Sequence, residues 1–78
     1  MASKHMYSEA DLAALAKHFR EKSGKTKAAI ARELGVSRAT MQDAEERPQQ
    51  SLTKIRIRII EFCSPYMIKG PAFWMEKK

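Results

Sequence analysis

The stretch that decides the fold runs from Thr26 to Arg47 and reads TKAAIARELGVSRATMQDAEER. Gly35 follows Leu34 where a first short helix would end, and glycine adopts the left-handed backbone of a helix end without steric cost. Ser37 comes two residues later and can cap a second helix through its hydroxyl. Two helices of eight or nine residues, joined by a glycine-containing turn, form a helix-turn-helix unit.

Apolar residues in this stretch fall at spacings that let the two helices pack together. Ile30, Ala31 and Leu34 share one face of the first helix. Met41 and Ala44 lie three residues apart on the second helix and can face them. Helices this short are not stable alone, so the unit needs further packing partners before or after it in the chain.

A supporting helix is predicted before the unit. Ser8 and Asp11 have the spacing of a capping box, and Ser23–Gly24 marks the end of the helix. Between them runs an apolar stripe at helical spacing, which should cover the back of the unit: Leu12, Leu15, Ala16 and Phe19. The opposite, solvent-facing side is assigned to Lys17, Arg20 and Glu21.

The segment 52–63 fits two interpretations. As a helix, it places most of its apolar side chains on one broad arc, with Arg56 inside that arc. As a strand, isoleucines and arginines would alternate from Ile55 to Ile59, and β-branched residues favour strands. The length of the segment and a capping serine at Ser51 favour the helix, which we prefer while the strand stays open.

The C-terminal residues indicate β structure. Tyr66, Ile68, Phe73 and Met75 predict a strand interrupted at Gly70–Pro71, which needs either the segment 52–63 or a second subunit as a partner. The expected fold class is mainly α. A three-helix core containing the helix-turn-helix is followed by a fourth helix (or strand) at 52–63 and a short C-terminal β strand or hairpin.

Three parts of the chain are expected. Residues 1–7 form a disordered leader, either vector-derived up to a natural start at Met6 or an ordinary frayed terminus. Residues 8–63 form the helix-turn-helix domain. Residues 64–78 form a C-terminal arm, which we expect to be β and dimer-forming.

Charge and composition narrow the function classes. The 78 residues carry a net charge of +6 with a pI of about 9.8, and residues 48–78 hold six basic against two acidic groups. This surplus favours an anionic partner. Cys63 is the single cysteine, which excludes a disulfide framework and fits a reducing cytosol. The chain has no apolar run of about 18 residues and no signal peptide pattern, so we expect a cytoplasmic, nucleoid-associated protein with no membrane partner.

The central stretch resembles the helix-turn-helix of the Cro and lambda-repressor-like family. The resemblance covers twenty-two contiguous residues and rests on Thr26, Ile30–Ala31, Leu34–Ser37, Thr40–Met41 and Glu45. The chain departs from the family at Lys27, where Gln is common, and at Arg47–Pro48, where Gly is common. The resemblance implies that Glu45 is buried and ties the second helix of the unit to its neighbours.

The resemblance and side-chain chemistry together assign DNA contacts. The second helix would present its first residues to base edges in the major groove. Arg38 can pair with guanine and Gln42 with adenine, and Asp43 can accept from cytosine. The predicted base contacts are Arg38, Ala39, Gln42 and Asp43. The predicted backbone contacts are Lys25, Lys27, Ser37, Thr40 and Arg47, with a phosphate at the helix N-terminus beside Lys27.

Several residues keep alternative roles. Glu46 is a poor phosphate neighbour and is expected to pair with Arg47 or Lys27 instead. Arg56 and Arg58 either reach the DNA backbone or line a solvated face. Cys63 is expected to be a small buried apolar residue. The predicted dimer interface consists of Tyr66, Ile68, Phe73 and Trp74.

These assignments predict a sequence-specific double-stranded DNA-binding transcriptional regulator, a bacterial or phage repressor that occupies an operator as a homodimer. The alternative is an antitoxin that binds a toxin protein through its C-terminal segment and autoregulates its operon. An enzyme is disfavoured because no nucleophile, base and orienting group occur together. No metal site and no cofactor are predicted, because His18 and the carboxylates lack ligand spacing.

Overall fold

The computed structural model describes residues 7–69 and 74–78 of the chain. It contains four helices and a two-stranded antiparallel sheet. The helices are α1 (Glu9–Ser23), α2 (Lys27–Leu34), α3 (Arg38–Glu46) and α4 (Thr53–Cys63), and the strands are β1 (Tyr66–Lys69) and β2 (Trp74–Lys77). The fold class predicted from the sequence is confirmed: it is mainly α, with a three-helix core, a fourth helix (or strand) at 52–63 and a short C-terminal β strand or hairpin. The predicted leader lies mostly outside the described residues.

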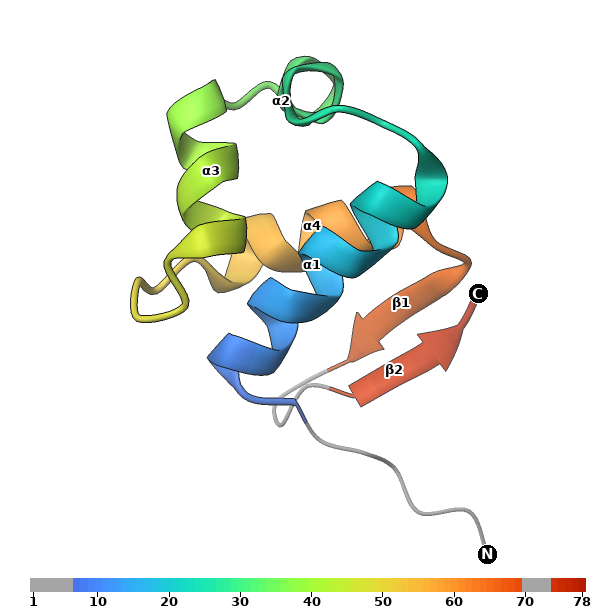
Figure 1. Cartoon of the computed structure of the whole chain (residues 1–78). Helices are drawn as coiled ribbons and strands as arrows, with labels where there is room; N and C mark the ends of the chain where they lie inside the picture. The colour runs from blue at the N-terminus through green and yellow to red at the C-terminus, as the bar shows by residue number, and fades with distance from the viewer. Residues whose placement is uncertain (1–6, 70–73) are drawn as a thin grey trace, which may run out of the picture.

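The helices are arranged in two levels (Figure 1). α1 packs chiefly against α4, and this pair forms the base of the domain. α2 and α3 lie on one side of the base, and the hairpin lies on the other, with β1 against α4. Cα atoms of Tyr66 and Lys77 pair at one end of the hairpin, and those of Lys69 and Trp74 pair at the other.

The helix boundaries follow the capping residues seen in the sequence. Ser8 and Asp11 form a complete capping box at the start of α1. Ser37 Oγ accepts a hydrogen bond of 3.0 Å from the Thr40 backbone N–H and so caps α3. Gly24 and Gly35 end α1 and α2 with φ values of 76° and 70°. Local sequence therefore fixes where the two helices of the unit begin and where α2 turns into α3.

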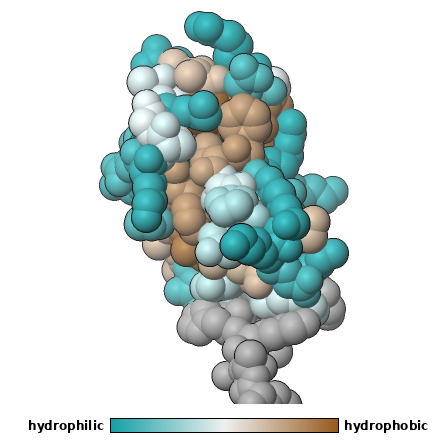
Figure 2. Space-filling view, turned by 90° about the vertical axis from the view of Figure 1, so that its right-hand side faces the viewer, coloured by the Kyte–Doolittle hydropathy of each residue, from teal (hydrophilic) through white to brown (hydrophobic). Residues whose placement is uncertain are grey.

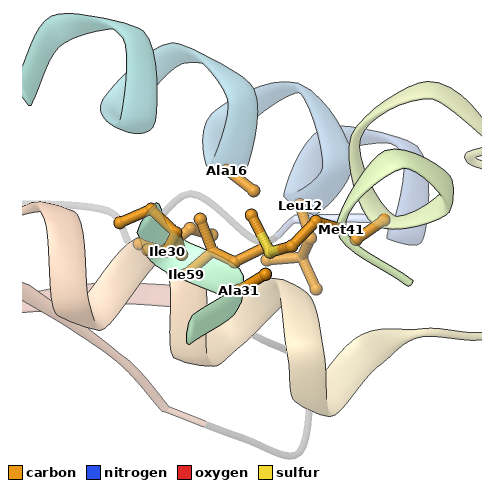
Figure 3. Close-up of a cluster of buried hydrophobic side chains, with 8 residues drawn as sticks. Leu12, Ala16, Ile30, Ala31, Met41 and Ile59 are labelled. Carbon is orange, nitrogen blue, oxygen red and sulfur yellow. The ribbon is translucent and has the colours of Figure 1, made fainter. Parts of the chain in front are cut away.

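One buried cluster joins all four helices (Figure 3). Leu12 and Ala16 of α1 meet Ile30 of α2, Met41 of α3 and Ile59 of α4, and all five side chains are fully buried. The predicted apolar faces of α1, α2 and α3 are confirmed. The small side chains of Ala16, Ala31 and Ala44 lie where the helices approach each other, and larger residues there would force the helices apart.

The segment 52–63 is a helix, as preferred. Arg56, Ile59 and Ile60 are fully buried, and their spacing of three and four residues places them on one face of α4. The predicted Ser51 cap is wrong, because Leu52 is the N-cap residue and no side chain caps the helix. Thr53 instead donates its hydroxyl proton to the carboxylate of Glu9, which ties the start of α4 to α1.

Of the C-terminal strand or hairpin that the sequence left open, the structure shows the hairpin. β1 and β2 pair with each other, so neither strand needs the segment 52–63 or a second subunit as its partner. Gly70–Pro71, which was predicted as a bend, and Phe73 of the predicted dimer interface lie outside the described residues. Ile68 of β1 packs against the core cluster, and this contact anchors the hairpin to the helices.

Replacing Gly35 by alanine should destabilise the protein by about 1 kcal/mol, because a Cβ atom is disfavoured in the left-handed region. The added Cβ would meet nothing within 4 Å, so the cost is conformational and not steric. Thermal unfolding should show a melting temperature lower by about 4–8 °C. Gly35→Asn is the matched control. Its melting temperature should fall less, since Asn tolerates the left-handed conformation. Equal losses for the two variants would contradict the conformational explanation.

Candidate nucleic-acid interface

α3 lies at an outer edge of the molecule (Figure 1). Arg38, Ala39 and Gln42 are exposed on it, and Asp43 is half-buried. Met41 and Ala44, on the opposite face of α3, are fully buried in the core. The helix therefore presents its first two turns to solvent and keeps its apolar side inside, which is the geometry needed to enter a groove.

A buried ion pair fixes the orientation of α3. Glu45 is only 6% exposed, and its Oε1 accepts a hydrogen bond of 3.0 Å from Arg20 Nη2, while Oε2 contacts Arg20 Nε. Arg20 Nη1 also donates to the Lys25 carbonyl at 2.9 Å. The hydrogen bond with Glu45 raises the pKa of Arg20, which stays charged. The expected structural role of Glu45 is confirmed, but Arg20 does not lie on a solvent face as predicted, because α3 packs against that side of α1.

Lys27 connects α2 to the exposed side of α3. Its Nζ donates to Gln42 Oε1 at 2.6 Å and lies 3.7 Å from Glu46 Oε2. The same Glu46 oxygen lies 3.2 Å from Lys17 Nζ of α1. The predicted pair of Glu46 with Lys27 is confirmed, whereas Lys17 was assigned to the solvent face of α1. The contact of Lys17 with Glu46 could not be predicted from local sequence patterns, because the two residues are 29 positions apart.

Other predicted contact residues already bond within the protein. Besides capping α3, Ser37 Oγ lies 2.9 Å from Thr40 Oγ1. Arg47 Nε lies 3.1 Å from Asp43 Oδ1, so an acidic and a basic candidate neutralise each other in the free protein. Lys25 Nζ lies 5.9 Å above the ring of Phe62 on α4, which places Lys25 near the end of the interface.

Both roles predicted for Arg56, a contact with the DNA backbone and a place on a solvated face, are wrong, because the side chain is fully buried. Its side chain is 0% exposed and donates to three backbone carbonyls, those of Ala44 (2.9 Å), Arg47 (2.7 Å) and Gln50 (2.7 Å). It also contacts the Glu9 carboxylate. The last carbonyls of a helix carry negative partial charge and lack partners within the helix. Arg56 supplies that partner for α3.

This contact explains how α3 ends without glycine. Arg47, the C-cap residue, has a φ of −124° and so does not adopt the left-handed conformation. The Arg47 backbone N–H bonds the Asp43 carbonyl, and Arg56 bonds the Ala44 carbonyl in the last turn and the carbonyl of Arg47 itself. Arg58 acts similarly at the end of α2, where Nη2 donates to the Leu34 carbonyl at 2.9 Å. Two arginines of α4 thus hold the C-terminal ends of both helices of the unit.

The chain was compared with known proteins. A family model described as "Helix-turn-helix domain" matches residues 11–53, which is more than half of the chain. The chain belongs to this helix-turn-helix family. No curated protein and no solved structure gives a significant match. The match runs from Asp11 in α1 to Thr53, the first residue of α4, so it contains all of α2 and α3 together with Lys17, Lys25 and Lys27.

Membership of the helix-turn-helix family supports DNA binding by this chain and assigns no enzymatic activity to it. In the described part of the chain, no group of three His, Cys, Asp or Glu side chains gathers as metal ligands. None of the described helices is long and apolar enough to cross a membrane.

A second surface lies away from α3. Figure 2 shows an apolar area framed by hydrophilic side chains on the side where the α1–α2 turn, the end of α4 and the hairpin meet. Phe62, near this end of α4, is 43% exposed. The next residue, Cys63, lines a pocket of about 370 Å³ together with Phe19, Lys22, Ser23, Ser64, Pro65 and Tyr66. Cys63 is half-buried and not fully buried as expected, and burial raises the pKa of its thiol.

The predicted dimer residues lie in or near this hairpin region. The Tyr66 ring lies 5.9 Å from that of Phe19, and Trp74 Nε1 donates to Glu76 Oε2 at 2.6 Å. Both aromatic side chains are half-buried, as is Ile68. Part of the surface of each of these three side chains therefore stays accessible to a further partner.

Replacing Lys17 by methionine should raise the pKa of the Glu46 carboxyl. The hydrogen bond from Lys17 is the largest cause of the lowered pKa of Glu46, and Lys27 adds to it. Because the pKa is lowered in the folded state, the interaction favours the fold above the ordinary carboxyl pKa and is lost as pH falls through the lowered value. Carboxyl NMR titration measures this pKa. An unchanged value in the variant would contradict the contact.

Proposed function

We propose that this helix-turn-helix protein is a Cro-like, sequence-specific repressor that binds double-stranded DNA as a homodimer. One observation carries the proposal. The exposed side of α3 bears Arg38, Ala39 and Gln42 together, and the buried pair of Arg20 with Glu45 holds that side outward. A helix fixed in this way can enter the major groove without rearrangement of the core.

The base-reading residues follow from their chemistry. Arg38, the first residue of α3, offers two parallel N–H donors to O6 and N7 of guanine. Ala39 places a methyl group where a thymine methyl can touch it. Gln42, one turn further, matches adenine once its amide is released from Lys27. Asp43 accepts from cytosine N4 in the same way, after release from Arg47.

The proposed backbone contacts surround α3. Thr26 caps α2, and the N–H groups of its first turn carry the positive end of the helix dipole. Lys25 and Lys27 flank this end and would hold a phosphate. Ser37 and Thr40 at the start of α3, and Arg47 at its end, are the further candidates. Such contacts release counterions, so binding should weaken steeply with salt.

The homodimer rests on the second surface. Residues 8–63 would form the DNA-binding domain and residues 64–78 the dimer-forming arm. Tyr66, Ile68 and Trp74, with Phe73 from outside the described residues, are the proposed contacts. Small domains often gain stability from association, because a single core of this size is modest. Two copies would read half-sites about 34 Å apart and repress by covering the operator.

An antitoxin is the second candidate, because the apolar area in Figure 2 fits a partner protein as well as a second copy of this chain. An exposed phenylalanine, followed in the chain by a residue that lines a pocket, fits a protein partner, which can be a toxin as well as a second copy. In that case the helix-turn-helix would autoregulate the operon, and the hairpin region would bind the toxin. The DNA-reading side of α3 is the same in both functions.

Selection of binding sites from random duplexes tests the proposal, followed by mass measurement of the complex. A repressor should enrich one sequence with two related half-sites and bind it as two copies per duplex. An antitoxin should bind DNA with a co-purified partner protein in the complex. Failure to enrich any sequence at low salt would contradict sequence-specific binding.

A further inference from the structure

One carboxylate oxygen of Glu46 faces two ammonium groups. Oε2 lies 3.2 Å from Lys17 Nζ and 3.7 Å from Lys27 Nζ, so lysines of two different helices converge on the last residue of α3. The three side chains are 29–42% exposed, and the site is therefore open to solvent. Among the described residues, Glu46 is the only carboxylate shared by two lysines at ion-pair distance.

A DNA phosphate offers these lysines the same partner as Glu46 does, namely a negatively charged oxygen. The position is also suitable. Lys27 is the first residue of α2, beside the N-terminal N–H groups that attract anions, and Lys27 also contacts Gln42 on the exposed side of α3. A phosphate of a strand that passes α3 would therefore meet Lys17 and Lys27 together.

We propose that Lys17 and Lys27 form a phosphate subsite, which the Glu46 carboxylate occupies in the free protein and a DNA phosphate occupies in the complex. This inference rests on the proposed DNA-binding function and adds two elements to it. Lys17 becomes a backbone contact, and Glu46 becomes a competitor that lowers affinity for every duplex.

Displacement of Glu46 also affects base reading. Lys27 Nζ bonds Gln42 Oε1 at 2.6 Å in the free protein, so the Gln42 amide is occupied. When Lys27 turns to a phosphate, the amide is released and can pair with a base edge. Docking on the DNA backbone and reading by Gln42 are thus coupled through one lysine.

The test compares duplex binding by wild type and Glu46→Gln over a range of salt concentrations. The variant keeps the shape of the side chain and removes its charge. We expect about three- to tenfold tighter binding at low salt, for operator and unrelated duplexes alike, since phosphates carry no sequence information. The slope of log affinity against log salt should stay close to that of wild type, because one phosphate occupies the subsite in both complexes.

Glu33→Gln is the matched control. Glu33 is exposed on α2, six positions after Lys27, and forms no ion pair among the described residues. Glu33→Gln changes the net charge by the same amount as Glu46→Gln, so it reports the general electrostatic effect on affinity. Its gain in affinity should be smaller than that of Glu46→Gln. The double variant, Lys17→Met with Glu46→Gln, should lose most of the gain in duplex affinity, because one of the two lysines is then missing.

A second readout does not depend on the variants. Adding operator duplex to wild type should raise the carboxyl pKa of Glu46 in NMR titration, since its lysine partners have moved to a phosphate. Unchanged affinity in Glu46→Gln, or an unchanged carboxyl pKa of Glu46 in the complex, would overturn the subsite while leaving DNA binding intact. If wild type itself binds no duplex, the proposed function fails and not the subsite alone.

Discussion

Replacing Arg38 by alanine is expected to weaken binding to the selected operator by about 1–3 kcal/mol, or roughly five- to 150-fold. Arg38 is exposed on the first turn of α3, and Ser37 caps that turn. A bidentate pair with guanine provides both affinity and discrimination, so the variant should also lose preference at one base pair of each half-site. Binding titrations against the operator and single-base variants measure both effects.

Arg32→Ala is the control for Arg38. It removes the same charge from an exposed position near the end of α2, which the proposed interface does not include. Its effect should be small and equal for all sequences. If Arg38→Ala behaves in the same way as Arg32→Ala, the base contact assigned to Arg38 is wrong, and α3 does not read DNA through its first turn.

Replacing Arg56 by methionine should destabilise the fold by roughly 3 kcal/mol, the largest stability effect that we expect. The change would leave three carbonyls without their donor and Glu9 without its cation. Glu9 keeps part of its exposure, so solvent would recover some of the loss on that side. Chemical denaturation measures the free energy of unfolding, and the melting temperature should fall by about 12 °C or more.

Arg58→Met provides the comparison on the same helix. Arg58 is exposed and donates one hydrogen bond, to the Leu34 carbonyl, so its loss should cost less than about 1 kcal/mol. A similar cost for both variants would show that burial of Arg56 does not matter. It would also remove our explanation of how α3 ends without a glycine.

Local signals made much of the fold predictable. Ser8, Ser37 and Gly35 each act within a few residues, because a cap bonds the turn next to it and a left-handed residue ends the helix before it. The apolar spacing of α1 to α3 was equally readable, since burial follows the helical period. For these elements the sequence and the structure agree.

Side chains that connect distant segments were not predictable from spacing. Lys17 and Arg20 share a polar side of α1, and periodicity alone assigns such a side to solvent. The structure packs the end of α3 against it, so both residues find carboxylates there. Arg56 fell inside the apolar arc of α4, which was the one sign of its burial, but its partners come from three other segments.

In the proposed function, the exposed side of α3 is the surface that meets DNA. Mapping of backbone amide NMR shifts on addition of operator duplex tests it most directly. The largest shifts should cluster at Arg38–Asp43, with a second group at Lys25–Lys27. Shifts concentrated instead at Phe62–Tyr66 and the hairpin, with α3 unchanged, would contradict it.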